Sequence, residues 1–103
     1  MTMDILEFHA EFCKVFSNPI RLEILNLLKE DEMIVTDITE RLGVPKANTS
    51  RHLNLMRLKK IIVRRRKGVN IYYRIADKKI VTACATMQNA LGELLDAASS
   101  SRY

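Results

Sequence analysis

Two short stretches of this 103-residue sequence carry the side chains best suited to chemistry. The first gathers small polar and basic residues: Lys46, Asn48, Ser50, Arg51 and His52. The second is an unbroken run of cations: Arg64, Arg65, Arg66 and Lys67. Side chains of these types bind phosphate oxygens and form hydrogen bonds with base edges. Both stretches are therefore candidate nucleic-acid contacts.

The two cysteines are the remaining reactive side chains. Cys13 and Cys84 are too few for a disulfide framework, and we expect reduced thiols in a cytosol. The simpler interpretation is that each is a small buried hydrophobic residue. The alternative is a thiol pair that senses oxidants, reactive sulfur or a thiophilic metal. His9 lies four residues before Cys13 on one helix face, where a surface role is simpler than a ligand role.

The charge of the chain is segregated along the sequence. The net charge is +5, yet residues 45–79 hold twelve Lys or Arg and a single acidic residue, Asp77. Residues 1–44 hold four basic and nine acidic residues, and residues 80–103 have a balance of −1. Soluble surfaces usually mix both signs. A basic third of the chain therefore favours a polyanionic partner over a merely solvated surface.

Enzymatic and membrane functions are not indicated. The two histidines, His9 and His52, have no evident acid or nucleophile partner, and no glycine-rich phosphate loop is present. No apolar run approaches the roughly 18 residues of a membrane helix. The first residues lack the basic region of a secretory signal. We expect a cytoplasmic binding protein that is not an enzyme and has neither a cofactor nor a membrane contact.

Hydrophobic spacing divides the chain into helices and one hairpin. Helices are predicted at about residues 4–16, 19–28, 36–42, 45–58 and 77–97. Their expected N-caps include Asp4, Asn18 and Thr36. Gly43 is expected to end the third helix in a left-handed conformation. Strands are predicted at residues 33–35, 61–66 and 71–75, with a turn at 67–70.

This order of elements is typical of a winged helix-turn-helix. We predict one mainly α domain with a small β-hairpin over residues 1–98, and a flexible polar tail at 99–103. In such a domain the helix at 45–58 enters the major groove N-terminus first, so its first turns meet base edges. Thr49, Leu53 and Met56 should face the core. The first and last helices carry apolar stripes that one small domain cannot bury, which predicts a homodimer.

Three motifs then indicate a family. The segments "NPIRLEIL", "TSRHL" and "RRRKGVNIYYRI", in this order, make residues 8–75 resemble the ArsR family of small dimeric winged-helix repressors. The resemblance implies dimerisation through the first and last helices, binding to an imperfect inverted repeat in double-stranded DNA, and release by an inducer. It maps the wing onto residues 64–70 and DNA reading onto six helix positions: Lys46, Ala47, Asn48, Ser50, Arg51 and His52.

The sequence departs from the family pattern at two helix ends. Lys60 stands where the family usually has a glycine after the DNA-reading helix, and a lysine in a left-handed cap costs about 1 kcal/mol relative to glycine. Pro45 replaces the usual small capping residue and so removes a side-chain cap. The change at Lys60 bears on the angle at which the wing approaches the helix, whereas Pro45 fits the preference for proline in the first turn of a helix.

Two family metal sites are absent from the sequence. One needs a Cys-x-Cys at the start of the third helix, where residues 33–37 contain no cysteine. The other needs Asp-x-His and a later histidine, but Asp77 is followed by Lys79 and no histidine follows His52. Zinc requires about four N, S or O ligands, so we expect no metal. Cys13 and Cys84 remain the candidate sensing residues.

The rival interpretation is a winged-helix module that acts through RNA or protein contacts without an inducer. RNA readers more often interleave aromatic and basic residues on a sheet. Here the hairpin has only Tyr72 and Tyr73, which are expected to form a strand pair with one ring inward. The sequence therefore favours a DNA-binding transcriptional regulator.

Overall fold

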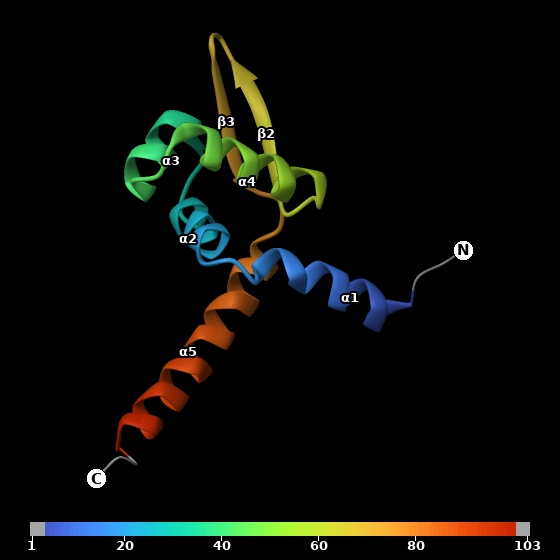
Figure 1. Ribbon diagram of the computed structural model, residues 1–103. Helices are drawn as coiled ribbons and strands as arrows, with labels where there is room; N and C mark the ends of the chain where they lie inside the picture. Colours follow the sequence, from blue (N-terminus) through green and yellow to red (C-terminus); the bar gives the residue numbers. More distant parts are fainter. Residues whose placement is uncertain (1–3, 101–103) are drawn as a thin grey trace.

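The computed structural model describes residues 4–100 and contains five α-helices, one 3-10 turn and a small sheet (Figure 1). The elements are α1 (Ile5–Cys13), η1 (Lys14–Phe16), α2 (Pro19–Leu28), β1 (Met33–Ile34), α3 (Val35–Leu42), α4 (Lys46–Leu58), β2 (Ile62–Lys67), β3 (Asn70–Ile75) and α5 (Lys78–Ser100). The predicted fold class is confirmed. The last helix extends beyond its predicted end at Ala97, and the final three residues of the predicted tail, 101–103, lie outside the described residues.

Two of the three predicted N-caps are confirmed. The Asp4 carboxylate accepts from the amides of Leu6 and Glu7 at 2.8 and 3.0 Å. Asn18 caps α2 in the same way, and Pro19 occupies the first helical position, where a missing N–H costs nothing.

The predicted cap at Thr36 is wrong. Helix α3 begins at Val35, and its N-cap residue, Ile34, forms no side-chain cap. Met33 and Ile34 pair with β3, so the helix must begin directly after this pairing ends. Thr36 consequently lies inside the first turn. A pairing between distant segments overrides the local capping signal.

The residues that follow α3 and α4, Gly43 and Lys60, both adopt the left-handed conformation. Gly43 ends α3 with φ +69°, as predicted, and its amide donates to the Thr39 carbonyl at 2.9 Å. Lys60 follows α4 with φ +64°. The amide of the next residue, Ile61, donates to the Met56 carbonyl at 3.0 Å, which completes a Schellman motif with both side chains fully buried. The helix therefore ends as it would with glycine, despite the lysine.

The three strands form an antiparallel sheet in the order β1-β3-β2. Lys67 pairs with Asn70, which leaves a two-residue turn at Gly68 and Val69. Gly68 has φ +64°, as the first residue of such a turn requires. Tyr73 packs against the core, whereas Tyr72 lies on the opposite face because side chains alternate along a strand. One ring therefore points inward, as predicted.

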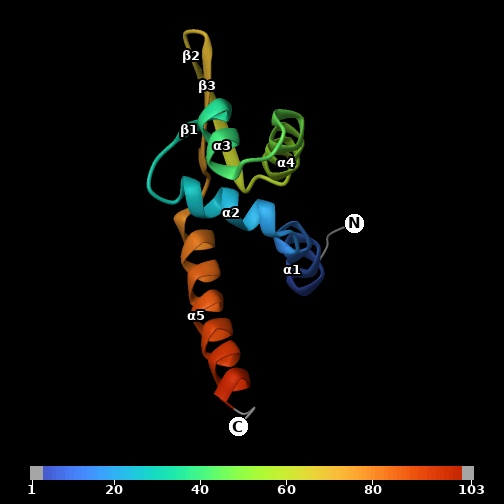
Figure 2. The same cartoon turned by 60° about the vertical axis from the view of Figure 1, so that its left-hand side comes forward.

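The hydrophobic core lies between residues 15 and 75. Its fully or nearly fully buried members are Val15, Ile24, Leu25, Leu28, Ile38, Leu53, Met56, Ile61, Ile62 and Ile75. Among the side chains that the structure describes, helices α1 and α5 contribute no buried residue, and they project from this core in two directions (Figure 2). A compact chain of this length would have a radius of gyration near 13 Å. The observed 15.9 Å reflects the two projecting helices.

Candidate nucleic-acid interface

Three buried side chains determine which face of α4 points outward. Thr49, Leu53 and Met56 recur at helical spacing and are fully buried, as predicted. Helix geometry then turns the intervening residues toward solvent. The exposed ones are Lys46, Ala47, Ser50, Arg51 and Asn54, and Asn48 is half-buried. Four of the six predicted DNA-reading residues are thus exposed on the outer side of α4, while Asn48 and His52 are half-buried.

The first turn of α4 is held by the backbone. The Pro45 carbonyl accepts from the amides of Asn48 and Thr49 at 2.9 and 3.3 Å, and Pro45 provides no side-chain cap. No acidic residue lies in this turn. The positive end of the helix dipole is therefore not compensated by a carboxylate, which favours an approaching phosphate.

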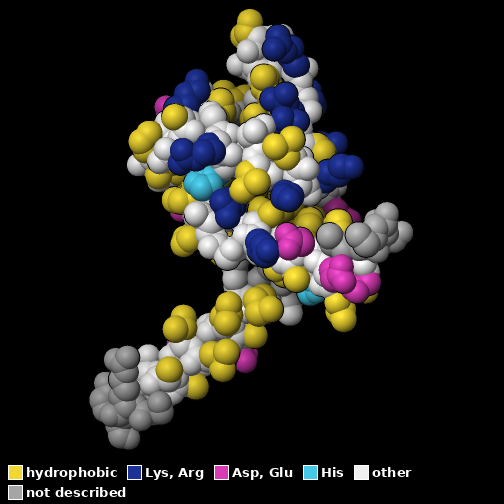
Figure 3. All heavy atoms as spheres, turned by 45° about the vertical axis from the view of Figure 1, so that its right-hand side comes forward, with side chains coloured by type: hydrophobic (Ala, Val, Ile, Leu, Met, Phe, Trp, Pro, Cys, Tyr) yellow, Lys and Arg dark blue, Asp and Glu magenta, His cyan; other side chains and the backbone are white. Residues whose placement is uncertain are grey.

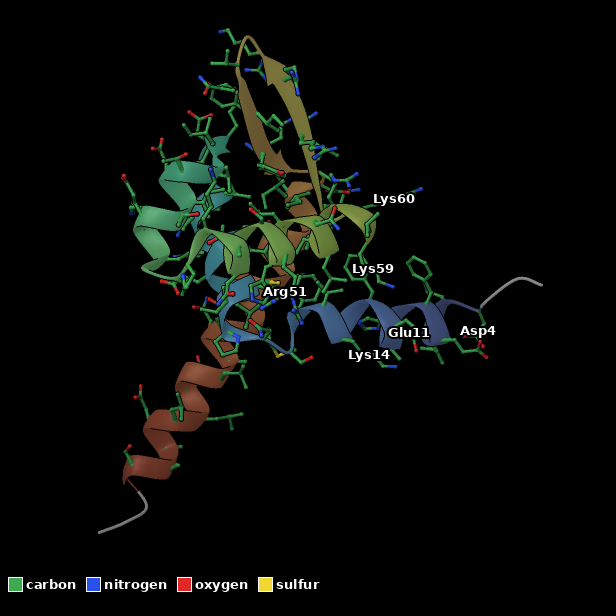
Figure 4. All side chains as sticks on the ribbon, turned by 45° about the horizontal axis from the view of Figure 1, so that its top comes forward. Asp4, Glu11, Lys14, Arg51, Lys59 and Lys60 are labelled. Atoms are coloured by element: carbon green, nitrogen blue, oxygen red, sulfur yellow. The ribbon has the colours of Figure 1, made fainter. Side chains whose placement is uncertain are left out.

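Asn48 and Arg51 lie one turn apart and point to the same side. An Arg51 Nη2 donor is 3.5 Å from Asn48 Oδ1, which is a long and weak hydrogen bond. Figure 4 shows Arg51 beside the middle of α4, and Lys59 and Lys60 just after the C-terminal end of the helix. The helix and the segment that follows it therefore present separate cationic groups.

His52 is held by a residue that the sequence analysis did not single out. Arg21, on α2, donates through Nε to the Val15 carbonyl at 2.6 Å, and its Nη1 lies 3.3 Å from His52 Nδ1. A guanidinium has no acceptor, so Nδ1 accepts and the ring proton resides on Nε2. Burial lowers the pKa of His52, and the charges of Arg21 and Arg51 lower it further. His52 is therefore a neutral donor.

The cationic run of the hairpin is divided between two faces. Ile62, at the start of β2, is fully buried and defines the core side of the sheet. Since side chains alternate, Arg64 and Arg66 extend from this same side, and Arg65 and Lys67 from the other. All four are exposed. The four residues predicted together are thus not brought to one surface.

Arg65 is engaged within the protein. Its Nε donates to Glu32 Oε2 at 2.9 Å, and its Nη2 pairs with Oε1 of the same carboxylate. Its guanidinium carbon lies 5.2 Å from the centre of the Tyr72 ring. The hydrogen bond from Arg65 holds the pKa of the Glu32 carboxyl below its usual range. Glu32 is 33 residues away in the sequence, and no local pattern indicates this pair.

The cations nevertheless gather on one part of the molecule. Figure 3 shows Lys and Arg side chains over α4 and the hairpin, whereas the visible face of α5 carries mainly hydrophobic side chains. The segregation along the sequence therefore becomes a segregation in space. A basic surface around an outward-facing helix is the electrostatic footprint of a nucleic-acid partner.

Comparison with known proteins identifies the family. Residues 18–59 match the arsR family of bacterial regulatory proteins. The chain is 41% identical to the transcriptional repressor PagR of Bacillus anthracis over 76 residues, which cover 73% of this chain and 76% of PagR. The chain belongs to the ArsR family. It is therefore related to transcriptional regulators and not to enzymes, as the sequence predicted.

Solved structures support the assignment to the ArsR family. A homodimeric winged helix-turn-helix DNA-binding domain from Mycobacterium bovis, described as a possible ArsR-family regulator, has a TM-score of 0.78 at 28% identity and covers 90% of this chain and 92% of its own. The Mycobacterium tuberculosis protein Rv0081 has a TM-score of 0.83 at 28% identity, with 93% and 97% covered. Both alignments extend over the terminal helices as well as the core.

This ArsR-family chain also has an apolar groove between its terminal helices. The groove has a volume of about 440 Å³, and its lining includes Phe12, Cys13, Phe16, Cys84, Met87 and Leu91. The structure thus brings both cysteines to one place. Cys13 is exposed and Cys84 half-buried. Burial raises the pKa of the Cys84 thiol, and the nearby Cys13 raises it further.

His9 also lines the groove. Within residues 4–100, no three His, Cys, Asp or Glu side chains are grouped closely enough to hold a metal ion. None of the helices in this described part of the chain is long and apolar enough to span a membrane.

Proposed function

We propose that this ArsR-family chain is a homodimeric repressor that binds an inverted repeat in double-stranded DNA and is released by an inducer. The observation that carries the proposal is the orientation of α4. Its buried face is fixed by three side chains, and its first turns present small polar and basic residues beside a basic hairpin. A helix that enters the major groove N-terminus first needs this arrangement.

The proposed contacts divide by chemistry. Asn48 and Arg51 can form hydrogen bonds with base edges, while the small side chains of Ala47 and Ser50 permit close approach of the helix to the groove. Lys46 can reach a phosphate. The neutral His52 offers one Nε2 donor. Arg64, Arg66 and Lys67 contact phosphates, which provides affinity without sequence preference. Arg65 belongs to the predicted set as well, but its guanidinium is paired with the Glu32 carboxylate.

The test is a titration of the wild-type protein with duplex DNA and, in parallel, with single-stranded RNA. If about six to ten phosphates are neutralised, log K should fall with log salt at a slope of about −5 to −9. Arg66→Ala should weaken binding to all duplexes alike and flatten the slope by about one unit, whereas Asn48→Ala should relax sequence preference. Tighter binding of RNA, or a flat salt response, would reject the proposal.

The RNA-binding alternative finds little support in the hairpin. Tyr73 packs against the core, and the Tyr72 ring is stacked under Arg65. Neither ring is free to serve as a platform for an unstacked base, which is how sheets commonly hold single-stranded RNA.

We propose that a second copy of the chain covers the exposed apolar surface of the terminal helices. Large apolar side chains are exposed along α1 and α5: Ile5, Leu6, Phe8, Met87, Leu91, Leu94 and Leu95. The groove between these helices is continuous with that surface. A two-fold dimer would bury both and separate the two α4 helices by about 34 Å, the spacing of successive major grooves. Sedimentation should detect a dimer at micromolar concentration, and a stable monomer would contradict the proposal.

The proposed inducer acts at the two thiols. Cys13 and Cys84 line one groove, on the helices that would set the distance between the two DNA-binding surfaces. A bond or bridge between them would bias that distance, and a coupling of about 1–3 kcal/mol would change DNA affinity about fivefold to 150-fold. The raised pKa of Cys84 lowers the fraction of this thiol that is ionised. Because the thiolate is the reactive form, this argues against high reactivity of Cys84.

The experiment measures DNA binding of wild type, Cys13→Ser and Cys84→Ser under oxidant, polysulfide, arsenite and cadmium. Release of the wild type by one of these agents, lost in both variants, is the expected result. An identical response of all three proteins would leave the cysteines a packing role only.

A further inference from the structure

Three side chains span the outer face of the sheet, on the side opposite the core. Glu32 directly precedes β1, Tyr72 lies in the central strand β3, and Arg65 lies in β2. Arg65 and Tyr72 are cross-strand partners, and Tyr72 is also paired with Ile34 of β1. We call Glu32, Tyr72 and Arg65 the cross-sheet tie, because together they connect all three strands.

The ion pair within the tie is better defined than an ordinary surface pair. Both carboxylate oxygens of Glu32 are engaged by two nitrogens of Arg65. Bidentate pairing restricts the geometry, and the Tyr72 ring restricts it further from one side. The Glu32 side chain is only 23% exposed, against 49% for Arg65, so solvent screens the pair incompletely.

Glu32 is surrounded by cations of the hairpin. Besides Arg65, the positive charges of Lys67 and Arg74 act on its carboxylate. A carboxylate in a basic surface should weaken DNA binding by simple electrostatics. Its presence requires a compensating role, and the geometry of the tie indicates one.

We infer that Glu32 is a positioning residue for DNA binding, which holds Arg65 on the outer face and so sets the angle at which the hairpin presents Arg64 and Arg66 beside α4. This inference rests on the proposed function. It also changes the role of Arg65, which braces the wing and does not contact phosphate. The two neighbouring arginines lie on the other face and remain free for that contact.

The test is a double-mutant cycle of Glu32→Gln and Arg65→Gln, measured on a duplex enriched from fragments of the source genome. Glu30→Gln is the matched control, since Glu30 is an exposed acid of the same loop and its substitution changes the net charge equally. Each tie variant should weaken binding to this duplex by about threefold to tenfold, and the double variant no further. The salt dependence of Arg65→Gln should equal that of the wild type.

A different pattern would overturn the inference. If Arg65→Gln flattens the salt slope by about one unit while Glu32→Gln binds like Glu30→Gln, then Arg65 contacts phosphate directly. Amide hydrogen exchange in the free protein gives an independent readout. Residues 62–75 should exchange faster in Glu32→Gln than in Glu30→Gln, and equal rates would also contradict the tie. If the wild type bound no duplex, the proposed function would fail, whereas the exchange comparison would still test the tie.

Discussion

The central part of the molecule, residues 15–75, and its two terminal helices are held in place in different ways. The central part has ten buried hydrophobic residues and two side-chain links between distant segments, Arg21 with His52 and Arg65 with Glu32. The terminal helices expose their large apolar side chains instead. One chain therefore suffices to position α4 and the hairpin, whereas α1 and α5 need a partner to bury their surface.

The largest expected effect separates the two regions. Leu91 lines the groove and is 47% exposed in the single chain. Leu91→Asp would place two unpaired carboxylates in the proposed dimer interface, so dimerisation should weaken by at least about a hundredfold. Sedimentation measures this change, and operator binding should be lost with it. The circular dichroism spectrum should stay close to that of the wild type. A loss of secondary structure would mean that the central part also depends on the dimer.

A core substitution in the central part should lower the free energy of unfolding by an amount that does not depend on dimerisation. Leu53 is fully buried on the inner face of α4. Leu53→Ala should lower the free energy of unfolding by about 2–5 kcal/mol because it leaves a cavity. In denaturant titrations at several protein concentrations, the loss should stay constant. Leu91→Ala is the matched control, and its effect should depend on concentration, since it acts through the dimer. The same concentration dependence for both variants would contradict the distinction between the central part and the terminal helices.

Within the central part, the left-handed residues Gly43 and Lys60 should respond to substitution with opposite changes in stability. Lys60→Gly should raise the free energy of unfolding by about 0.5–1 kcal/mol, because glycine adopts φ +64° without steric cost. Gly43→Ala should lower it by about 1 kcal/mol for the same reason, although a Cβ there would meet no atom within 4 Å. Thermal or chemical denaturation distinguishes the two signs. A destabilised Lys60→Gly would indicate that the lysine side chain makes a contribution of its own.

The smallest expected effect concerns pH and His52. Its pKa lies below the ordinary value, so the unfolded chain binds a proton here more readily than the folded chain. The stability from this group is therefore present above about pH 6.5 and is lost as the pH falls through the folded pKa. An NMR titration should place the pKa of His52 below 6.5, and Arg21→Gln should raise it. No change in that variant would mean that Arg21 does not hold the ring.

Features governed by near neighbours in the sequence were predictable. The caps at Asp4 and Asn18, the left-handed Gly43, the inward face of α4 and the single inward tyrosine all follow from spacing and local chemistry. The cations of residues 45–79 likewise gather over α4 and the hairpin (Figure 3), although the hairpin divides its own four between two faces. The contacts assigned to individual DNA-reading residues remain predictions.

Features that depend on contacts between distant segments were decided by the tertiary structure. Thr36 failed as a cap because Met33 and Ile34 pair with β3, far along the chain. The meeting of Cys13 and Cys84 in one groove depends on where the fold places the last helix relative to the first. In the sequence, nothing distinguishes Arg65 from the three cations beside it. In the structure, strand alternation places it on the opposite face from Arg64 and Arg66, and it pairs with a carboxylate 33 residues away. Sequence patterns determine which residues share a local face, whereas only the folded chain determines which faces meet.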